Sequence, residues 1–357
     1  RLLMFQGLGI PRFYVDTFSY YNAIGYGDWP DYTTDNDSNQ IGINPIRRFE
    51  RYMEENEAGS VMAFGKAETP PLWLIPNHQP SNFMAILGHN FGGRTLAIEV
   101  HKYSGGNNFT IRNPEFSEIV NWTGEDDITP TYDGFSIADI TNASDGWGNF
   151  VSEVSVNNET GNSAYTFKGG SLVMGQYYDM HSPDLRLNLA YKHDSIKTSQ
   201  VINGGTISNA LNTKAPDWGD LGAWQLYESD VEPWAAGTGR NYRSSRRTWD
   251  LSFSYLSDTD VFPVNATTTN PLQDNIHDDT LLNGTDFFSV VYNKTLGSAL
   301  PFIFQPNAPK YDADGNQIGG NNNPDQFCIA KFIGDSLKVT QSNFRTYKIK
   351  LKIEEVW

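Results

Sequence analysis

Apolar and polar residues alternate one by one near the end of the chain, which is the pattern of a β-strand with one buried face. The apolar positions are Tyr347, Ile349, Leu351 and Ile353, and they alternate with Lys348, Lys350, Lys352 and Glu354. About a hundred residues earlier the pattern recurs, with one face formed by Trp249, Leu251, Phe253 and Tyr255. An arginine, a threonine and an aromatic residue begin each segment. The pattern predicts two strands whose apolar faces are buried, and a terminal strand held in a sheet.

Further short apolar runs, bounded by Gly, Asn, Asp and Pro, fill the middle of the chain and predict more strands. These runs lie at 72–75, 83–87, 95–103, 135–140, 171–179, 185–191, 197–201 and 248–255. The segment 203–206, Asn-Gly-Gly-Thr, is typical of a tight hairpin turn. Three polar insertions, at 104–130, 142–163 and 212–243, are expected to project as loops. The pattern predicts an all-β protein, built as a jelly roll or β-sandwich with few short helices.

Differences along the chain predict three segments: 1–60, 61–258 and 259–357. The first contains a strand at 13–18 and a helix that begins at Asn44-Pro45 and ends at Gly59, and we interpret it as an arm or belt. The alternative is that it packs on the sandwich that follows. The second segment is the sandwich. The third, with a short helix in 281–295 and strands at 300–304, 326–332 and 337–341, is expected to be β-rich and to pack on that sandwich.

Composition supports a β-rich chain and narrows its partners. The 357 residues are 13% aromatic and only 19% charged, and they include 32 Gly and 18 Pro, which favours strands and turns over helices. A net charge of −16 opposes binding to nucleic acid or to an anionic membrane. The single cysteine, Cys328, excludes an intrachain disulfide and a multi-cysteine zinc site. No segment has the length of an apolar membrane helix, and we do not expect the first ten residues to form a signal peptide, because the apolar run is too short and is interrupted by glycine.

One local string resembles a known family. The apolar run 83–87 is followed by Gly88-His89-Asn90 and then by Gly92-Gly93, which resembles an early strand of the galactose-binding-like jelly rolls of bacteriophage virion proteins. The strings 247–256, 300–306 and 347–357 look like those of phage tail or minor structural proteins. The resemblance implies a non-enzymatic subunit of a phage tail, in a distal-tail or tail-tip ring, which contacts other phage structural proteins. It also implies assembly in the bacterial host cytoplasm and a place in the virion, but no sugar site.

Two groups of residues are candidates for contacts. Trp218, Trp224 and Trp234 lie in a loop rich in Gly, Pro and Asp, where tryptophan can stack on a sugar, anchor a subunit contact or cover the sandwich core. Basic residues are concentrated in a second cluster, consisting of Arg240, Arg243, Arg246 and Arg247. This cluster either pairs with the acidic surface of a neighbouring copy or is a solvated loop with local ion pairs. The alternative function is therefore a carbohydrate-binding module that contacts a cell-surface glycan.

Signatures of catalysis or of a cofactor are weak. The segment 312–316, Asp-Ala-Asp-Gly-Asn, resembles the start of a calcium loop but lacks the distal glutamate, and it fits a hairpin turn better. His89 and Asn90 fit a hydrogen-bonded turn better than a ligand site. The histidines lack the spacing of a shared metal site, and the chain contains no nucleophile elbow, phosphate loop or paired-histidine metal motif. We therefore expect neither an enzyme nor a bound cofactor or metal.

Overall fold

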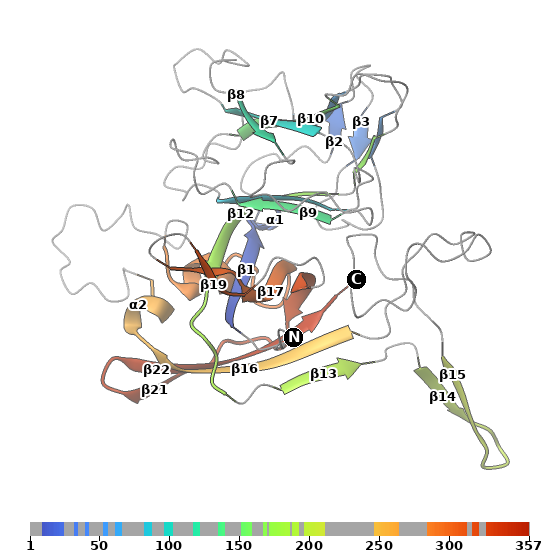
Figure 1. Cartoon of the computed structure of the whole chain (residues 1–357). Coiled ribbons are helices and arrows are strands. Elements are labelled where there is room, and N and C mark those ends of the chain that lie inside the picture. The colour runs from blue at the N-terminus through green and yellow to red at the C-terminus, as the bar shows by residue number, and fades with distance from the viewer. Residues whose placement is uncertain are drawn as a thin grey trace.

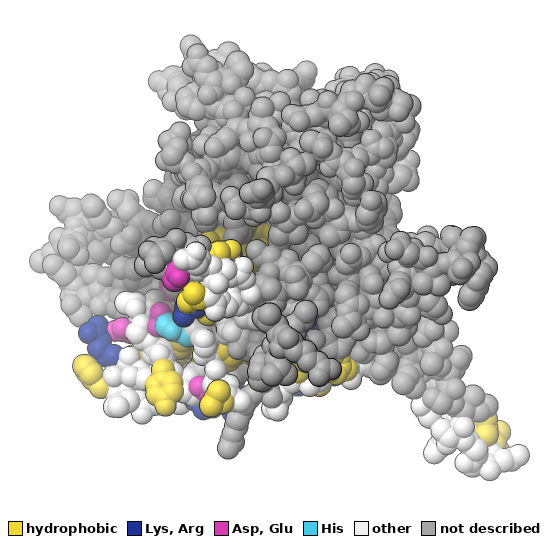
Figure 2. Space-filling model, in the orientation of Figure 1, with side chains coloured by type: hydrophobic (Ala, Val, Ile, Leu, Met, Phe, Trp, Pro, Cys, Tyr) yellow, Lys and Arg dark blue, Asp and Glu magenta, His cyan; other side chains and the backbone are white. Residues whose placement is uncertain are grey.

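A computed structural model of the chain shows its arrangement (Figure 1), and the described side chains form the coloured surface in Figure 2. The described residues are 9–24, 32–34, 40–42, 53–55, 61–65, 82–87, 96–102, 117–121, 135–139, 151–158, 167–169, 171–185, 188–192, 196–210, 246–263, 284–312, 316–320 and 326–356.

One antiparallel sheet of ten strands dominates the described structure and confirms the all-β prediction. Its strands are, in spatial order, β13 (Asn188–Lys192), β16 (Arg246–Leu256), β22 (Thr346–Glu355), β20 (Cys328–Phe332), β17 (Phe302–Ala308), β1 (Ile10–Asp16), β12 (Ser171–Asp179), β6 (Phe83–Leu87) and β9 (Phe135–Asp139). The tenth strand, β21 (Val339–Asn343), pairs with β22. Strands from all three predicted segments therefore share one sheet, while the boundaries at 60 and 258 stay predictions.

Smaller sheets complete the described strands. A four-stranded sheet has the order β5 (Val61–Gly65), β10 (Val151–Asn158), β7 (Leu96–Lys102) and β8 (Ser117–Asn121). The two-stranded sheets are β4 (Met53–Glu55) with β11 (Phe167–Gly169), β14 (Ile196–Gln200) with β15 (Thr206–Ala210), β18 (Lys310–Tyr311) with β19 (Gln317–Gly319), and β2 (Tyr32–Thr34) with β3 (Gln40–Gly42). A jelly-roll or sandwich arrangement of these sheets stays a prediction.

Helical structure is confined, among the described residues, to α1 (Thr17–Ala23), α2 (Asp258–Val261) and a π-helical turn η3 (Phe288–Tyr292). The turn η3 lies inside the helix predicted in 281–295. The helix predicted to end at Gly59 is wrong over its second half, because Met53–Glu55 forms a strand that pairs with β11. Two of the predicted loop insertions are also wrong in part, since β8 lies within 104–130 and β10 within 142–163. Both strands pair with β7, and β10 is distant from β7 in the sequence.

The two segments of matching pattern pair with each other. In the antiparallel pair β16–β22, Trp249 lies opposite Ile353, Leu251 opposite Leu351, and Phe253 opposite Ile349. All six side chains are buried, as predicted, and they form the centre of the main core cluster. Tyr347 is half-buried and packs against the same cluster.

The burial predicted for Tyr255 is wrong. The register of β16 against β22 shifts between Phe253 and Leu256, so one residue is added to β16 at this point. Leu256 takes the buried position opposite Tyr347, and the Tyr255 side chain is 86% exposed. A bulge of this kind interrupts the two-residue period that the sequence pattern assumes.

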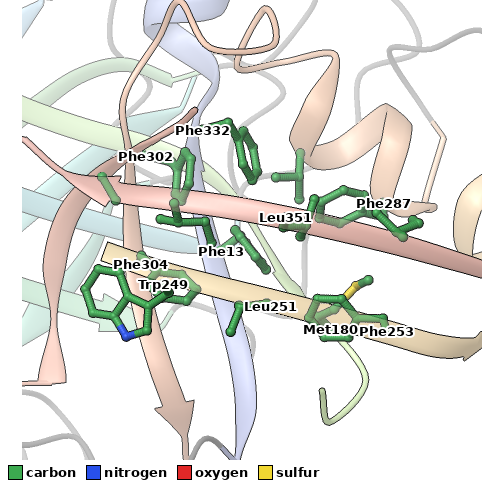
Figure 3. Packing of buried hydrophobic residues seen from close by; sticks show 14 of the residues in the cluster. Phe13, Met180, Trp249, Leu251, Phe253, Phe287, Phe302, Phe304, Phe332 and Leu351 are labelled. Carbon is green, nitrogen blue, oxygen red and sulfur yellow. The ribbon is translucent and has the colours of Figure 1, made fainter. Parts of the chain in front are cut away.

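Aromatic rings from distant parts of the chain meet around Phe13 of β1 (Figure 3). Its ring centroid lies 5.2–5.9 Å from those of Phe287, Phe302, Phe304 and Phe332. β1 is hydrogen-bonded on one side to β12 and on the other to β17. Residues 10–16, from the segment interpreted as an arm, therefore form an internal strand of the sheet, and fully buried Phe13 belongs to the main core cluster.

Candidate interface on the outer face of the sheet

Basic side chains gather on the outer face of strands β13, β16, β22 and β21, opposite the core. Partners directly across an antiparallel pair lie on the same face of a sheet. The pairs on this face are Lys192 with Arg246, Asp250 with Lys352, Ser252 with Lys350, Thr248 with Glu354, and Lys348 with Thr340. We call Lys192, Arg246, Lys348, Lys350 and Lys352 the basic face. The basic face has five positively charged side chains, and two acidic residues, Asp250 and Glu354, lie between them. This surface is therefore positive, although the whole chain has a net charge of −16.

Several charges on the basic face are partly compensated. Lys192 forms an exposed ion pair with Glu354, at 3.0 Å between Nζ and Oε1. Asp184 lies beside β16, where its Oδ2 accepts a hydrogen bond from the Ser254 hydroxyl at 2.6 Å. Burial opposes ionisation of Asp184, but hydrogen bonds from Ser254 and Ser252 and the charge of Lys348 hold its pKa below the usual range. Lys350, by contrast, lies opposite an uncharged residue, Ser252.

The end of the basic face is closed by polar contacts between α2 and the β21–β22 hairpin. Arg345, in the hairpin turn, donates to Asp258 of α2 at 2.7 Å between Nε and Oδ2. Asp260 of α2 accepts hydrogen bonds from the Ser257 amide and hydroxyl, at 2.8 and 2.7 Å, and its Oδ2 lies 3.2 Å from His181 Nε2. Polar, charged and apolar side chains lie together on this part of the surface (Figure 2).

Two aromatic side chains are exposed in this region. Tyr255 lies at the β16 bulge and Phe344 in the β21–β22 turn, where the two side chains are 86% and 83% exposed. Tyrosine, phenylalanine and arginine are enriched in protein interfaces, and a polar rim surrounds the interface core. The arrangement can therefore bind another protein surface through charge and aromatic contact.

Buried polar side chains of the described sheet form hydrogen bonds to side chains of neighbouring strands. Glu355 of β22 accepts three hydrogen bonds from Arg247 of β16, and Arg247 also donates to the Phe327 carbonyl. Tyr14 of β1 donates to Gln305 of β17 at 2.9 Å. Arg12 forms a two-point contact with Asp179 at 2.6 and 2.9 Å. These contacts fix the register of neighbouring strands.

Lys294 is another buried polar side chain, and its pKa is strongly perturbed. Its ammonium group donates to Gln176 Oε1 at 2.9 Å and is fully enclosed. Burial lowers the pKa of Lys294 to about 8, against the opposing effect of the nearby Asp286 carboxylate. Asp286 accepts hydrogen bonds from the Ser289 amide and hydroxyl, at 3.0 and 2.6 Å, and thereby begins η3. The sequence contains no local pattern that marks Lys294 as buried.

The predicted contact residues are only partly covered by the structure. Trp218, Trp224, Trp234, Arg240 and Arg243 lie outside the described residues, as do His89 and Asn90. Arg246 belongs to the basic face and lies opposite Lys192. Arg247, which the sequence placed in the same basic cluster, points to the opposite face and is buried with Glu355.

The described part of the calcium-like segment belongs to a hairpin. The Asp312 backbone amide donates a hydrogen bond to the Asn316 carbonyl at 2.9 Å. The Asp312 side chain in turn accepts a hydrogen bond from the Asn316 backbone amide at 2.8 Å. These two residues connect β18 to β19, which agrees with the hairpin alternative. Within the described ranges, no cluster of three or more His, Cys, Asp or Glu is placed to hold a metal, and no helix is long and apolar enough to cross a membrane.

The sequence shows the alternating lysines of the last strand, but it does not show that Lys192 and Arg246 lie on the same face as these lysines, because that depends on which strands are neighbours. Comparison with protein-family models, curated proteins and solved structures finds no match for this chain.

Proposed function

We propose that this protein is a non-enzymatic structural subunit that assembles with copies of itself. Given the resemblance of its strings to phage tail proteins, the assembly we propose is a ring in the distal tail or tail tip of a phage virion. Its further partners are then other phage structural proteins. The carbohydrate-binding alternative depends on Trp218 and Trp224, which lie outside the described residues.

The observation that carries the proposal is the basic face on an otherwise strongly acidic chain. Copies with a net charge of −16 repel one another unless a surface of opposite charge meets the acidic remainder. The basic face provides that surface on a regular, rigid sheet. Complementary charge of this kind fixes the orientation of two subunits and excludes other partners.

The buried polar groups support a structural role over a catalytic one. Arg247, Glu355, Tyr14 and Gln305 use their polar atoms to connect neighbouring strands. Such contacts make a rigid sheet on which an interface keeps its shape.

The test compares two charge reversals by sedimentation velocity over a range of protein concentrations. Lys350→Glu lies at the centre of the basic face, between Lys348 and Lys352, so the new carboxylate has favourable neighbours within the subunit. Lys310→Glu, on exposed β18, changes the net charge equally and controls for general repulsion. We expect Lys350→Glu to weaken self-association about fivefold more than Lys310→Glu does, as for the loss of one surface ion pair. Equal effects of the two variants, or a wild-type protein that stays monomeric at every concentration, would refute the proposal.

A further inference from the structure

The bulge in β16 turns Tyr255 out of the core. Strict alternation after buried Phe253 would place Tyr255 on the buried face, but the register shift adds one residue, and Leu256 takes the buried position instead. The Tyr255 side chain is consequently 86% exposed, on a strand whose other end carries Arg246 of the basic face. Bulges are frequent where a strand re-aims a side chain at a functional surface. The bulge therefore presents one aromatic side chain to solvent beside the basic face.

Phe344 is held in an equally exposed position in the turn between β21 and β22. Asn343 and Thr346 are paired on either side of this turn. The Phe344 amide donates to Asn343 Oδ1 at 2.8 Å, and the Thr346 hydroxyl donates to the Phe344 carbonyl at 3.3 Å. Arg345 adopts a φ of 52°, a conformation that favours glycine, and its ion pair with Asp258 at 2.7 Å holds it there. The turn thus displays Phe344 from a fixed backbone, which lowers the entropic cost of binding through this side chain.

These two aromatic side chains are large enough to supply much of a subunit interface. An aromatic side chain buries about 150–250 Å² when it is enclosed. A stable interface takes about 800 Å² from each partner, so the pair would supply about 300–500 Å² of it. Tyrosine is also among the residues that most often dominate binding energy. Its ring provides apolar area while its hydroxyl can donate to a carboxylate, so Tyr255 suits an acidic partner surface.

Tyr255 lies close enough to both Lys350 and Phe344 for one interface to cover all three. Lys350 is opposite Ser252, three residues before Tyr255 along β16, which is about 10 Å at the rise of a strand. Phe344 is about as far in the other direction, three residues before Tyr347 at the bulge. A contact of about 800 Å² is about 30 Å across. A contact centred on Tyr255 therefore includes the centre of the basic face and the exposed turn.

We propose that Tyr255, with Phe344 beside it, anchors the basic face of one copy on the acidic surface of the next copy in the ring. The contact joins two different surfaces, so it repeats around the ring axis instead of closing a dimer. A second copy is the occupant because a chain with a net charge of −16 offers the acidic surface that complements the lysines around Tyr255. The inference rests on the self-assembly proposed above and names the side chains that supply its apolar contact.

The variant that tests the anchor is Tyr255→Ala, and its matched control is Tyr311→Ala. Tyr311 lies on β18, outside the basic face, and is 54% exposed, so the same substitution is made at a second surface position. Neither substitution changes the net charge, and unfolding in urea checks that both variants are folded. Sedimentation velocity over a range of concentrations gives the dissociation constant of self-association. We expect Tyr255→Ala to raise it about tenfold or more, and Tyr311→Ala to leave it unchanged.

Salt separates the aromatic anchor from the charges of the basic face. In about 1 M salt the Debye length is about 3 Å, so attraction between surface charges is screened, whereas the burial of an aromatic ring is not. We expect the ratio of the Tyr255→Ala and wild-type dissociation constants to persist in this salt. The corresponding ratio for Lys350→Glu should fall toward one.

Two results would overturn the inference: a Tyr255→Ala protein that associates as tightly as the Tyr311→Ala protein, or a Tyr255→Ala effect that disappears in high salt. If Lys350→Glu still weakens self-association more than Lys310→Glu in either case, the proposed function stands without this anchor. A wild-type protein that stays monomeric at every concentration would refute both.

Discussion

Replacing Glu355 with alanine tests how the terminal strand is held in the sheet. Glu355 is completely buried, and its two carboxylate oxygens accept three hydrogen bonds from Arg247. The donors are the Arg247 backbone amide at 3.0 Å, Nε at 3.2 Å and Nη2 at 3.0 Å. Arg247 also donates to the Phe327 carbonyl at 3.2 Å, in the residue before β20. One side chain therefore connects β22 to β16, and through Arg247 to the start of β20.

The expected loss for Glu355→Ala is about 3–5 kcal/mol in the free energy of unfolding. Coulomb attraction is only part of this cost. The substitution leaves the Arg247 guanidinium buried without its carboxylate, and the Arg247 amide without an acceptor. Since folded domains are stable by about 5–15 kcal/mol, the loss is a large fraction of the total.

The preceding residue provides the control. Glu354 points to the outer face and forms an exposed ion pair with Lys192 at 3.0 Å, so Glu354→Ala is expected to cost at most about 1 kcal/mol. Both variants are measured by equilibrium unfolding in urea. A double variant, Arg247→Met with Glu355→Leu, should recover part of the stability, because an apolar pair of similar volume avoids the desolvation of two charges but leaves the backbone amide of residue 247 without its acceptor. If Glu355→Ala costs no more than Glu354→Ala, the pair is open to water and the reasoning fails.

Two further predictions concern the core and its titration. Between pH 8 and about 10.5, Lys294 keeps its proton in the unfolded chain but releases it in the folded protein. The free energy of unfolding of the wild type should therefore rise with pH in this window, by about 3 kcal/mol in total relative to a Lys294→Met variant. Unfolding curves of both proteins across the window measure this change, and a difference that stays constant with pH would contradict the burial of the Lys294 ammonium group. At the β16 bulge, Phe253→Ala should lower the free energy of unfolding by about 3–5 kcal/mol and Tyr255→Ala by no more than about 0.5 kcal/mol, whereas similar losses in the two variants would show that the bulge is misplaced.

Local pattern was sufficient to predict most strands of the large sheet. The period of two at 248–255 and 347–353 predicted both strands, and the run at 171–179 coincides with β12. Signals of this kind are local, because a strand with one buried face shows its burial in every second residue. The hairpin turn at 203–206 was predictable for a similar reason, since a positive φ at Gly204 favours glycine.

Pairing between distant strands was not predictable from such signals. Nothing local places β1 between β12 and β17, or joins β10 to β7, because strand order depends on contacts between residues far apart in the chain. A bulge also leaves no mark in an alternating sequence, so Tyr255 was assigned to the wrong face. Trp218, Trp224, Trp234, Arg240 and Arg243 stay predictions, since they lie outside the described residues.

One buried pair could have been found by extending the pattern by one step. Arg247 precedes Trp249 by two residues and Glu355 follows Ile353 by two, so both continue the buried face of their strands. Because Trp249 and Ile353 lie opposite each other, Arg247 and Glu355 must also meet, and their opposite charges make that meeting favourable. The same step carried along the outer face aligns Asp250 with Lys352 and Ser252 with Lys350. A single register therefore accounts for both the buried ion pair that fixes the terminal strand and the basic face that we propose meets a neighbouring copy.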